Sequence, residues 1–483
     1  MHDTLPAVLR AAAERFGDHP AFVDGDQTVS FAQLLERVRA TASGYAGLGL
    51  EPGNRLVLWG PNSIDWVVAA LATSYAGGVL IPANSRYTAH EVADIVERTD
   101  ARLVVVSDGF LDRTQIADLT PLVPGRTLLD ITALPTDGAD VQQRADAVSP
   151  DDVADILFTS GTTGRPKGAM SAHRQTIGVA RAWAEVAGIR PDDRYLVVNP
   201  FFHSFGYKIG IVVGLLTGAT LYPVATFDLQ QTLRLIESER ITVFPGAPAI
   251  YQAMLATDRS AYDLSSLRLA VTGAAMIPVV LIERMKDELG FDDVLTAFGM
   301  TEAVVVTMCR QGDDAETIAT TSGRAIPGME TRIGEEGELL VRGDHVMLGY
   351  LDDPEATAAA IDADGWLHTG DVGNLDEAGN LRITDRLKDM YISGGFNVYP
   401  AEVEQALLRA EGVQDVAVIG VPDERLGEVG KAFVVGTATA EELLEFAKER
   451  LANFKIPRYV ETIDALPRNL SGKVLKNELR SRA

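Results

Sequence analysis

Hydrophobic and polar positions alternate in two different ways across residues 1–300. Stretches with apolar residues every three or four positions, typical of amphipathic helices, are separated by short apolar, often β-branched runs, typical of buried strands. The short runs occupy residues 55–59, 103–106, 156–158, 269–272 and 294–296. The helical patterns occupy residues 5–16, 228–239, 248–256 and 278–289, the last two with a proline in the first helical turn. This alternation predicts an α/β domain.

The pattern changes twice in the remainder of the chain. Residues 323–380 form short strand-like runs separated by Gly, Asp and Pro, which predicts a small β subdomain. After Arg386 comes another unit, with a helix opened by Pro400, strands at 416–421 and 432–435, and a helix at 441–451. The order of these elements predicts a separate, small α+β domain at the carboxyl end.

Two long apolar stretches raise the question of a membrane span. They occupy residues 66–82 and 209–225, and both contain glycines and polar residues such as Ser74 and Thr217. Each is shorter than the roughly 20 apolar residues that a spanning helix needs. A buried helix followed by a strand is therefore expected in both places.

Composition and charge narrow the class of protein. The chain has 483 residues, of which 46% are hydrophobic and 23% charged, so we expect a folded protein of two or more domains. The formal net charge of -25 argues against nucleic acid as a partner, because such binding needs clustered Lys and Arg. Cys309 is the only cysteine, which excludes an intrachain disulfide and a thiolate zinc cluster. The amino terminus lacks a secretory signal pattern, so a cytoplasmic location is expected.

A loop rich in glycine and hydroxyl residues follows the strand-like run at 156–158. It reads Thr159-Ser160-Gly161-Thr162-Thr163-Gly164-Arg165-Pro166-Lys167-Gly168. Its glycines allow backbone N–H groups to approach phosphate oxygens, its hydroxyls donate hydrogen bonds, and Lys167 adds a positive charge. A flexible surface turn is the alternative for any such cluster, but this loop is equipped to hold a polyphosphate.

Two other nucleotide motifs do not fit. A Walker A loop is excluded because Gly430-Lys431 and Gly472-Lys473 lack the leading glycine and the following hydroxyl residue. The glycines at 47–53 have the wrong final spacing for a dinucleotide fingerprint.

A second segment, Ala297-Phe298-Gly299-Met300-Thr301-Glu302, follows the strand-like run at 294–296. An aromatic ring such as that of Phe298 can stack on adenine, Thr301 can bind a phosphate, and Glu302 is a suitable ligand for phosphate-bound Mg²⁺. Alone, Phe298 could equally be a core residue, and Thr301 and Glu302 could begin a helix.

Together these segments resemble the adenylate-forming superfamily, which includes acyl-CoA synthetases, luciferases and peptide-synthetase adenylation domains. Ten consecutive positions match its phosphate loop, and Phe298 stands where tyrosine is commoner. Further matching segments, in the family's order, are residues 28–34, 271–275, 367–371, 385–389 and 467–473. The resemblance covers essentially the whole chain and is specific for adenylate formation, but not for one acid.

The resemblance implies a fold and a set of nucleotide contacts. It implies a large N-terminal domain of packed α/β layers with a small β subdomain, residues 1–385, and a small mobile α+β domain, residues 386–483, hinged near Lys388. Asp371 and Arg386 would face the ribose, and Lys473 would be the catalytic cation that offsets charge in the transition state. The implied ATP-binding residues are Thr159, Ser160, Gly161, Thr162, Thr163, Gly164, Lys167, Gly273, Ala274, Ala275, Ala297, Phe298, Gly299, Thr301, Asp371, Arg386 and Lys473.

The implied reaction has two half-reactions and uses ATP, Mg²⁺ and coenzyme A. A carboxylate attacks the α-phosphate of ATP to give an acyl adenylate and pyrophosphate, with Glu302 on the metal, and no protein nucleophile is needed. The small domain then rotates about Lys388 and presents Ser393, Gly394 and Gly395 to the pantetheine arm of CoA.

The acyl pocket is implied by residues 200–208, with His203 as a gate that contacts the carboxylate or swings aside, and with Phe205 and Lys208 nearby. A packed histidine and a solvent-facing lysine are the alternatives. Lys208 is expected to meet a second polar group of the acid, such as a ketone. The stretch 201–228 looks like actinobacterial acyl-CoA ligases of steroid breakdown, whose acids are propanoate-bearing ring fragments; fatty and aryl acids stay open.

Two other functions remain open at this point. The acceptor of the acyl group could be the phosphopantetheine of a separate carrier protein instead of CoA. The chain could also be a nucleotide-binding homologue without turnover, because fold alone does not prove activity. Sequence does not decide whether the chain forms a homo-oligomer.

Overall fold

The computed structural model describes residues 2–160, 166–273, 279–386, 390–398, 400–467, 474 and 476–482. The chain divides into two compact units. The first contains Met1–Ser85, Val96–Leu157 and Ala169–Asp385, and the second contains Arg86–Ile95, Phe158–Gly168 and Arg386–Ala483. The change of unit between Asp385 and Arg386 falls where the pattern of the sequence also changes.

A seven-stranded sheet has the strand order β17-β8-β7-β4-β3-β5-β6. Strands β3, β4 and β5 are parallel and almost entirely buried, which explains why they read as continuous apolar runs instead of alternating ones. The strands are β3 (Arg55–Trp59), β4 (Val79–Ala83), β5 (Leu103–Val106), β6 (Thr127–Asp130), β7 (Val153–Ser160), β8 (Pro166–Ala172) and β17 (Gly349–Tyr350).

Two four-stranded sheets follow, with orders β2-β1-β10-β9 and β11-β12-β13-β14. Single bridges through Val243 connect β9 to β11. The strands are β1 (Pro20–Asp24), β2 (Gln27–Ser30), β9 (Arg194–Val197), β10 (Thr220–Pro223), β11 (Leu269–Gly273), β12 (Asp293–Phe298), β13 (Thr307–Met308) and β14 (Arg324–Ala325).

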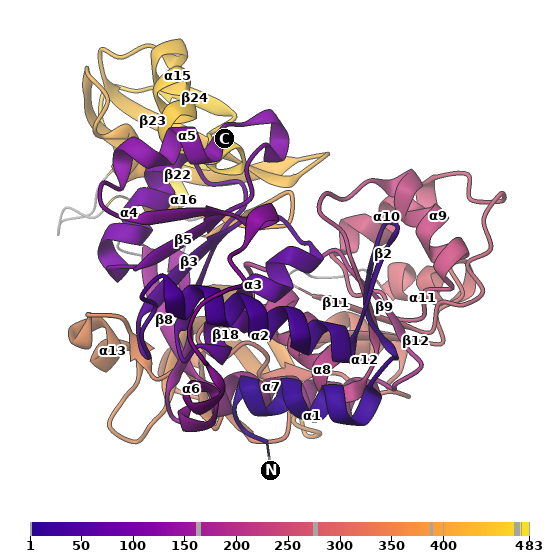
Figure 1. The fold of residues 1–483 in the computed structure, drawn as a ribbon. Helices are drawn as coiled ribbons and strands as arrows, with labels where there is room; N and C mark the ends of the chain where they lie inside the picture. Colours follow the sequence, from indigo (N-terminus) through magenta and orange to yellow (C-terminus); the bar gives the residue numbers. More distant parts are fainter. Residues whose placement is uncertain are drawn as a thin grey trace. The chain divides into compact units, whose positions relative to one another are not determined.

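Helices of the first unit pack around these sheets, and α1, α2 and α3 pack against one another (Figure 1). Ser30 caps α2 through a reciprocal bond with Gln33, so its start is set locally. The helices are α1 (Leu5–Phe16), α2 (Phe31–Gly47), α3 (Ile64–Tyr75), α5 (Gln115–Leu119), α6 (Gln142–Ala147), α7 (His173–Ala187), α8 (Val213–Thr217), α9 (Leu229–Glu239), α10 (Pro248–Ala256), α11 (Val279–Asp287), α12 (Ala315–Thr320) and α13 (Pro354–Ala360). Helix α4 (Ala89–Thr99) runs across the division between the units.

The predicted β subdomain is present as a fourth sheet, with the order β15-β16-β18-β19. Its strands are β15 (Met329–Ile333), β16 (Glu338–Gly343), β18 (Leu367–Leu375) and β19 (Leu381–Arg386). The pairs β15–β16 and β16–β18 are antiparallel. The connection from β15 to β16 is short, as is common between antiparallel neighbours, whereas β17 and α13 lie between β16 and β18 in the chain.

The second unit has its own sheet and core. The order β21-β20-β23-β22 is extended by β24 on β23, and Val418, Val434 and Leu443 belong to the cluster beneath the helices. The elements are β20 (Tyr391–Ser393), β21 (Phe396–Val398), α14 (Pro400–Leu407), β22 (Val413–Asp423), β23 (Gly427–Gly436), α15 (Ala440–Arg450), β24 (Tyr459–Thr462) and α16 (Lys476–Arg480).

The elements expected from the sequence are confirmed with small shifts of their ends. The apolar stretch 66–82 contains most of α3 followed by β4, and 209–225 contains a helix followed by β10. In the second case the helix begins as a π-helix, Phe205–Val212, before it continues as α8. Of the helices in the described part of the chain, none combines the length and apolarity needed to cross a membrane.

Candidate active site

The two predicted adenine-side segments lie side by side at the carboxyl ends of two parallel strands. Gly273, the last residue of β11, is in register with Ala297 of β12. A side chain at position 273 would come within 2.7 Å of the Ala297 carbonyl oxygen, so only glycine fits here. Carboxyl ends of neighbouring parallel strands are a common place for ligands in α/β proteins. Ala274 and Ala275 lie outside the described residues.

The chain turns sharply after β12. A Cβ at Gly299 would lie 1.8 Å from the Val304 carbonyl oxygen, so the loop closes directly over this glycine. The half-buried ring of Phe298 packs against the hydrophobic core on one side, in agreement with either of the two roles considered for it. Thr301 and Glu302 do not begin a helix: the structure places them in a turn.

Glu302 is held at both its backbone and its side chain. Its carbonyl oxygen accepts a hydrogen bond from Met347 N at 2.7 Å, and its Oε1 accepts one from the Tyr350 hydroxyl at 2.8 Å. Glu302 as a whole is only 9% exposed. A carboxylate fixed in this way has one defined orientation.

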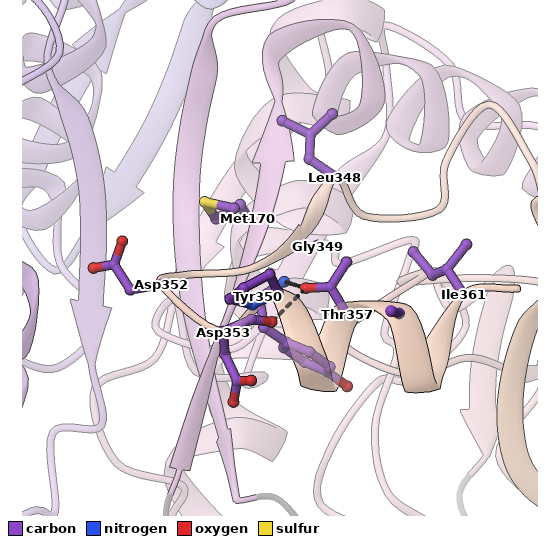
Figure 2. Close-up of a pocket in the computed structure, with 10 residues that line it drawn as sticks. Met170, Leu348, Gly349, Tyr350, Asp352, Asp353, Thr357 and Ile361 are labelled. Atoms are coloured by element: carbon purple, nitrogen blue, oxygen red, sulfur yellow. Dashed lines mark hydrogen bonds between the residues drawn. The ribbon is translucent and has the colours of Figure 1, made fainter. Parts of the chain in front are cut away.

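Tyr350 is itself fixed by its neighbours. Figure 2 shows Thr357, whose hydroxyl accepts a hydrogen bond from Tyr350 N at 2.9 Å and donates one to the Asp353 carbonyl oxygen at 2.8 Å. These residues line a surface hollow that also includes Met170 and Leu348. None of the site residues predicted from the sequence lines this hollow. Its lining includes Tyr350, whose hydroxyl bonds to Glu302.

Asp371 lies on β18, in the β15-β16-β18-β19 sheet. Glu338, on the neighbouring β16, accepts hydrogen bonds from Gly370 N and from His368, both at 2.9 Å. The Thr369 hydroxyl accepts from Asp371 N at 3.1 Å and donates to a β16 carbonyl at 2.7 Å. The backbone that carries Asp371 is thus anchored on each side.

The phosphate loop begins and ends on two strands. Strand β7 ends at Ser160 and β8 begins at Pro166, and the Thr159 hydroxyl donates to the Lys167 carbonyl oxygen at 3.4 Å. The residues Gly161, Thr162, Thr163, Gly164, Lys388 and Lys473 lie outside the described residues, as do the side chains of Ser160 and Arg386.

The acyl segment turns at His203 into the π-helix. His203 is exposed, and its Nδ1 accepts a hydrogen bond from Phe205 N at 3.2 Å, which leaves Nε2 to carry the proton of the neutral ring. Phe205 meets Trp183 edge to face, with ring centres 6.0 Å apart. The packed-histidine alternative is therefore wrong for His203.

Lys208 differs most from what the sequence suggested. It is 1% exposed, so the solvent-facing alternative is wrong. Its Nζ lies 2.9 Å from Asp155 Oδ1 and donates to Ser171 Oγ at 2.8 Å. The predicted contact with a ketone of the acid stays a prediction, and the structure gives this ammonium group two protein partners.

The predicted CoA segment is a tight hairpin turn in the second unit. Ser393 pairs with Phe396, and the two residues between them, Gly394 and Gly395, have φ angles of 56° and 85°. Two successive positive φ angles define the turn type that glycine favours in two-residue hairpins. Gly394 and Gly395 are exposed, whereas Ser393 is buried.

Three polar residues near these segments were missed from the sequence. Tyr350 and Glu338 are each more than 25 positions away from the residues they hold, and no local motif marks them. Asp155 did leave a signal, because it is the one charge inside the run 153–158. A charge inside a buried strand must be paired.

Comparison with known proteins settles the family. The model of the AMP-binding enzyme family matches residues 9–351, and that of the AMP-binding enzyme C-terminal domain matches residues 402–473. The chain belongs to the AMP-binding enzyme family. It is an AMP-forming acid:CoA ligase, and family membership supports ATP and CoA as its substrates.

Relatives and solved structures agree with this assignment. The chain is 56% identical to the 3-[(3aS,4S,7aS)-7a-methyl-1,5-dioxo-octahydro-1H-inden-4-yl]propanoyl:CoA ligase of Rhodococcus jostii and 53% identical to the ligase of the same name from Mycobacterium tuberculosis, over 99% of this chain and 98% of each relative. It also resembles the structure of o-succinylbenzoate CoA synthetase from Bacillus subtilis bound with a product analogue, with a TM-score of 0.90 and 28% identity over 99% of this chain and 98% of that one. Against ATP-bound MatB from Rhodopseudomonas palustris the TM-score is 0.71, at 31% identity over 100% and 99% of the two chains.

Proposed function

We propose that this ligase activates a propanoate side chain attached to a bicyclic, ketone-bearing ring fragment. The observation that carries the proposal is the identity of 56% and 53%, over 99% of this chain, to two ligases named for such an acid. More distant relatives carry other names, such as the feruloyl-CoA synthase of Amycolatopsis at 38% identity. The resemblance of residues 201–228 to ligases of steroid breakdown supports the same acid.

The acyl segment suits a compact apolar skeleton. Phe201 and Tyr207 are buried and pack on Trp66, with ring centres 5.3 and 6.1 Å from it. Phe201 and Tyr207 belong to the same segment as exposed His203 and half-buried Phe205, so the packing of their rings gives this segment a rigid apolar support. A rigid apolar support favours a ring system, because a saturated bicycle buries apolar surface and loses little conformational freedom on binding.

We infer that adenylate formation follows the roles implied by the family motifs. The phosphate loop would hold the pyrophosphate, Asp371 and Arg386 the ribose, and Lys473 the reacting oxygens. His203, whose Nδ1 accepts a hydrogen bond from Phe205 N, would sit beside the carboxylate as a neutral ring that adds no charge. Gly394 and Gly395 would let a thin pantetheine arm approach.

The residues present fit a magnesium ion held mainly by substrate. Within the described part of the chain no three His, Cys, Asp or Glu side chains form a metal cluster. Mg²⁺ is commonly held by one or two carboxylates together with substrate phosphates and water, and Glu302 supplies one oriented carboxylate. When bound, the ion would neutralise phosphate charge in the first half-reaction.

The test is an acid panel with AMP release measured in the presence of ATP, Mg²⁺ and CoA. The panel contains the indane-dione propanoate, its diketone-free analogue, octanoate, ferulate and o-succinylbenzoate. We expect kcat/KM for the indane-dione propanoate to exceed that for the others by about 100-fold, the discrimination that roughly 3 kcal/mol of differential binding provides. Preference for ferulate or octanoate would contradict the proposed acid without contradicting the ligase activity.

A further inference from the structure

An ion pair that the reaction does not use directly lies in the core of the first unit. Lys208 and Asp155 are 1% and 0% exposed, and their charged atoms are 2.9 Å apart. Burying a pair of charges is costly, and an apolar pair of similar volume is often at least as stable. The position of this pair therefore needs a reason other than stability.

Four elements meet at the pair. Asp155 lies on β7, and its Oδ2 accepts a hydrogen bond from the Thr176 hydroxyl on α7 at 2.7 Å. Lys208 lies on the π-helix, and its Nζ donates to the Ser171 hydroxyl on β8 at 2.8 Å. Strand β7 leads into the phosphate loop and β8 leads out of it, so both strands that border the loop are tied to the π-helix.

The π-helix is in turn tied directly to His203. Tyr207 N, next to Lys208 in the chain, donates to the His203 carbonyl oxygen at 3.0 Å, and His203 N donates to the Pro200 carbonyl oxygen at 3.0 Å. A Cβ at Gly206 would lie 2.1 Å from that same Pro200 oxygen, so the helix starts in close contact with the acyl segment. A shift of Lys208 would consequently move the backbone of His203.

We propose that the Asp155–Lys208 pair is a positioning device, which fixes the His203 segment against the two strands that border the phosphate loop and so aligns the acid with ATP. The proposal rests on the acid:CoA ligase activity and not on the identity of the acid. It also reassigns Lys208: this residue acts through His203 and does not contact a ketone of the substrate.

The test uses neutral replacement of the whole pair. Lys208→Met alone leaves the Asp155 carboxylate buried without its partner and is expected to unfold readily. The double variant Asp155→Asn, Lys208→Met removes both charges and keeps an acceptor for Thr176. Urea unfolding first establishes that this double variant is folded.

Two half-reactions are then measured separately, acid-dependent ATP–pyrophosphate exchange and thioester formation from a preformed acyl adenylate and CoA. In the double variant we expect kcat for exchange to fall by at least about tenfold with KM for ATP within about threefold, because misplaced reactants slow only the step that joins them. Thioester formation should stay within about twofold, since the acyl–phosphate bond already exists. The order of preference among acids should not change.

A matched control is available in the same unit. Arg268 and Asp193 form an ion pair at 2.6 Å with side chains 13% and 4% exposed, at the amino ends of β9 and β11. The double variant Asp193→Asn, Arg268→Met removes this pair, which lies at the opposite end of β11 from Gly273. We expect this variant to retain kcat in both half-reactions.

Three outcomes would overturn the proposal. They are exchange at the wild-type rate in a folded Asp155→Asn, Lys208→Met enzyme, equal loss in both half-reactions, and a changed order of acids, which would show that Lys208 contacts substrate. If the double variant does not fold, the variant Ser171→Ala tests the proposal instead. It keeps the ion pair but removes the tie to β8, and it should slow exchange alone by about three- to fivefold; no effect on exchange would refute the proposal.

Discussion

Removal of the Tyr350 hydroxyl tests how Glu302 is oriented for its proposed metal. In Tyr350→Phe the ring stays, and the 2.8 Å hydrogen bond to Glu302 Oε1 is lost. Hydrogen bonds to charged groups contribute about 1.5–3 kcal/mol, and part of this value is recovered when water or Mg²⁺ replaces the donor. If about 1.4 kcal/mol is lost from metal binding, the half-saturating concentration of Mg²⁺ rises about tenfold.

The assay is acid-dependent ATP–pyrophosphate exchange at a series of free Mg²⁺ concentrations. We expect the half-saturation point to rise about tenfold and the rate at saturating Mg²⁺ to recover to within about threefold of wild type. The matched control is Tyr262→Phe, because the Tyr262 hydroxyl donates to Gln230 at 2.9 Å in an exposed position. An unchanged Mg²⁺ dependence in Tyr350→Phe would refute the argument that Tyr350 orients the ligand.

Three further predictions concern residues that hold the fold of the two units. Burial lowers the pKa of His173 to about 4 from 6.5, so the neutral ring contributes stability above pH 6.5 that is lost as pH falls towards 4. The free energy of unfolding should drop by about 3 kcal/mol more in wild type than in His173→Gln between pH 7 and 4, as measured by urea titration, and parallel curves would contradict this. Gly299→Ala should abolish exchange while the second unit stays folded in limited proteolysis, because a Cβ would lie 1.8 Å from the Val304 carbonyl oxygen. Lys455→Met should destabilise the second unit by about 3–5 kcal/mol in thermal unfolding. It leaves two largely enclosed carboxylates, those of Glu91 and Glu402, without the ammonium group that lies 3.0 and 2.7 Å from them.

Local pattern was enough to predict most elements and the motif segments, but not how side chains meet. Helix α10 begins and ends where its proline and apolar spacing indicate, and β3 and β5 match their apolar runs residue by residue. These features depend on neighbours in the chain. The π-helix at 205–212 could not be predicted, because an apolar stretch has the same hydropathy in an α- or a π-helix.

The partners of Lys208 and Glu302 could not be predicted for a different reason. Lys208 meets Asp155 across 53 positions and Glu302 meets Tyr350 across 48. Both pairs therefore depend on how a strand packs against a helix or a turn that is distant in sequence. The sequence did indicate that an unusual charge was present in β7. It did not indicate which cation would neutralise it.

The register of β11 and β12 has a consequence for enzyme engineering. Where Gly273 meets Ala297, the surface proposed for adenine is made of main chain packed too closely for any larger side chain at 273. Substitution of side chains can therefore change little in the surface proposed for adenine. The acyl segment, in contrast, presents side chains such as those of His203 and Phe205. A library directed at residues 200–205 should yield ligases for new acids that still require ATP, provided that the buried Asp155–Lys208 pair is left intact.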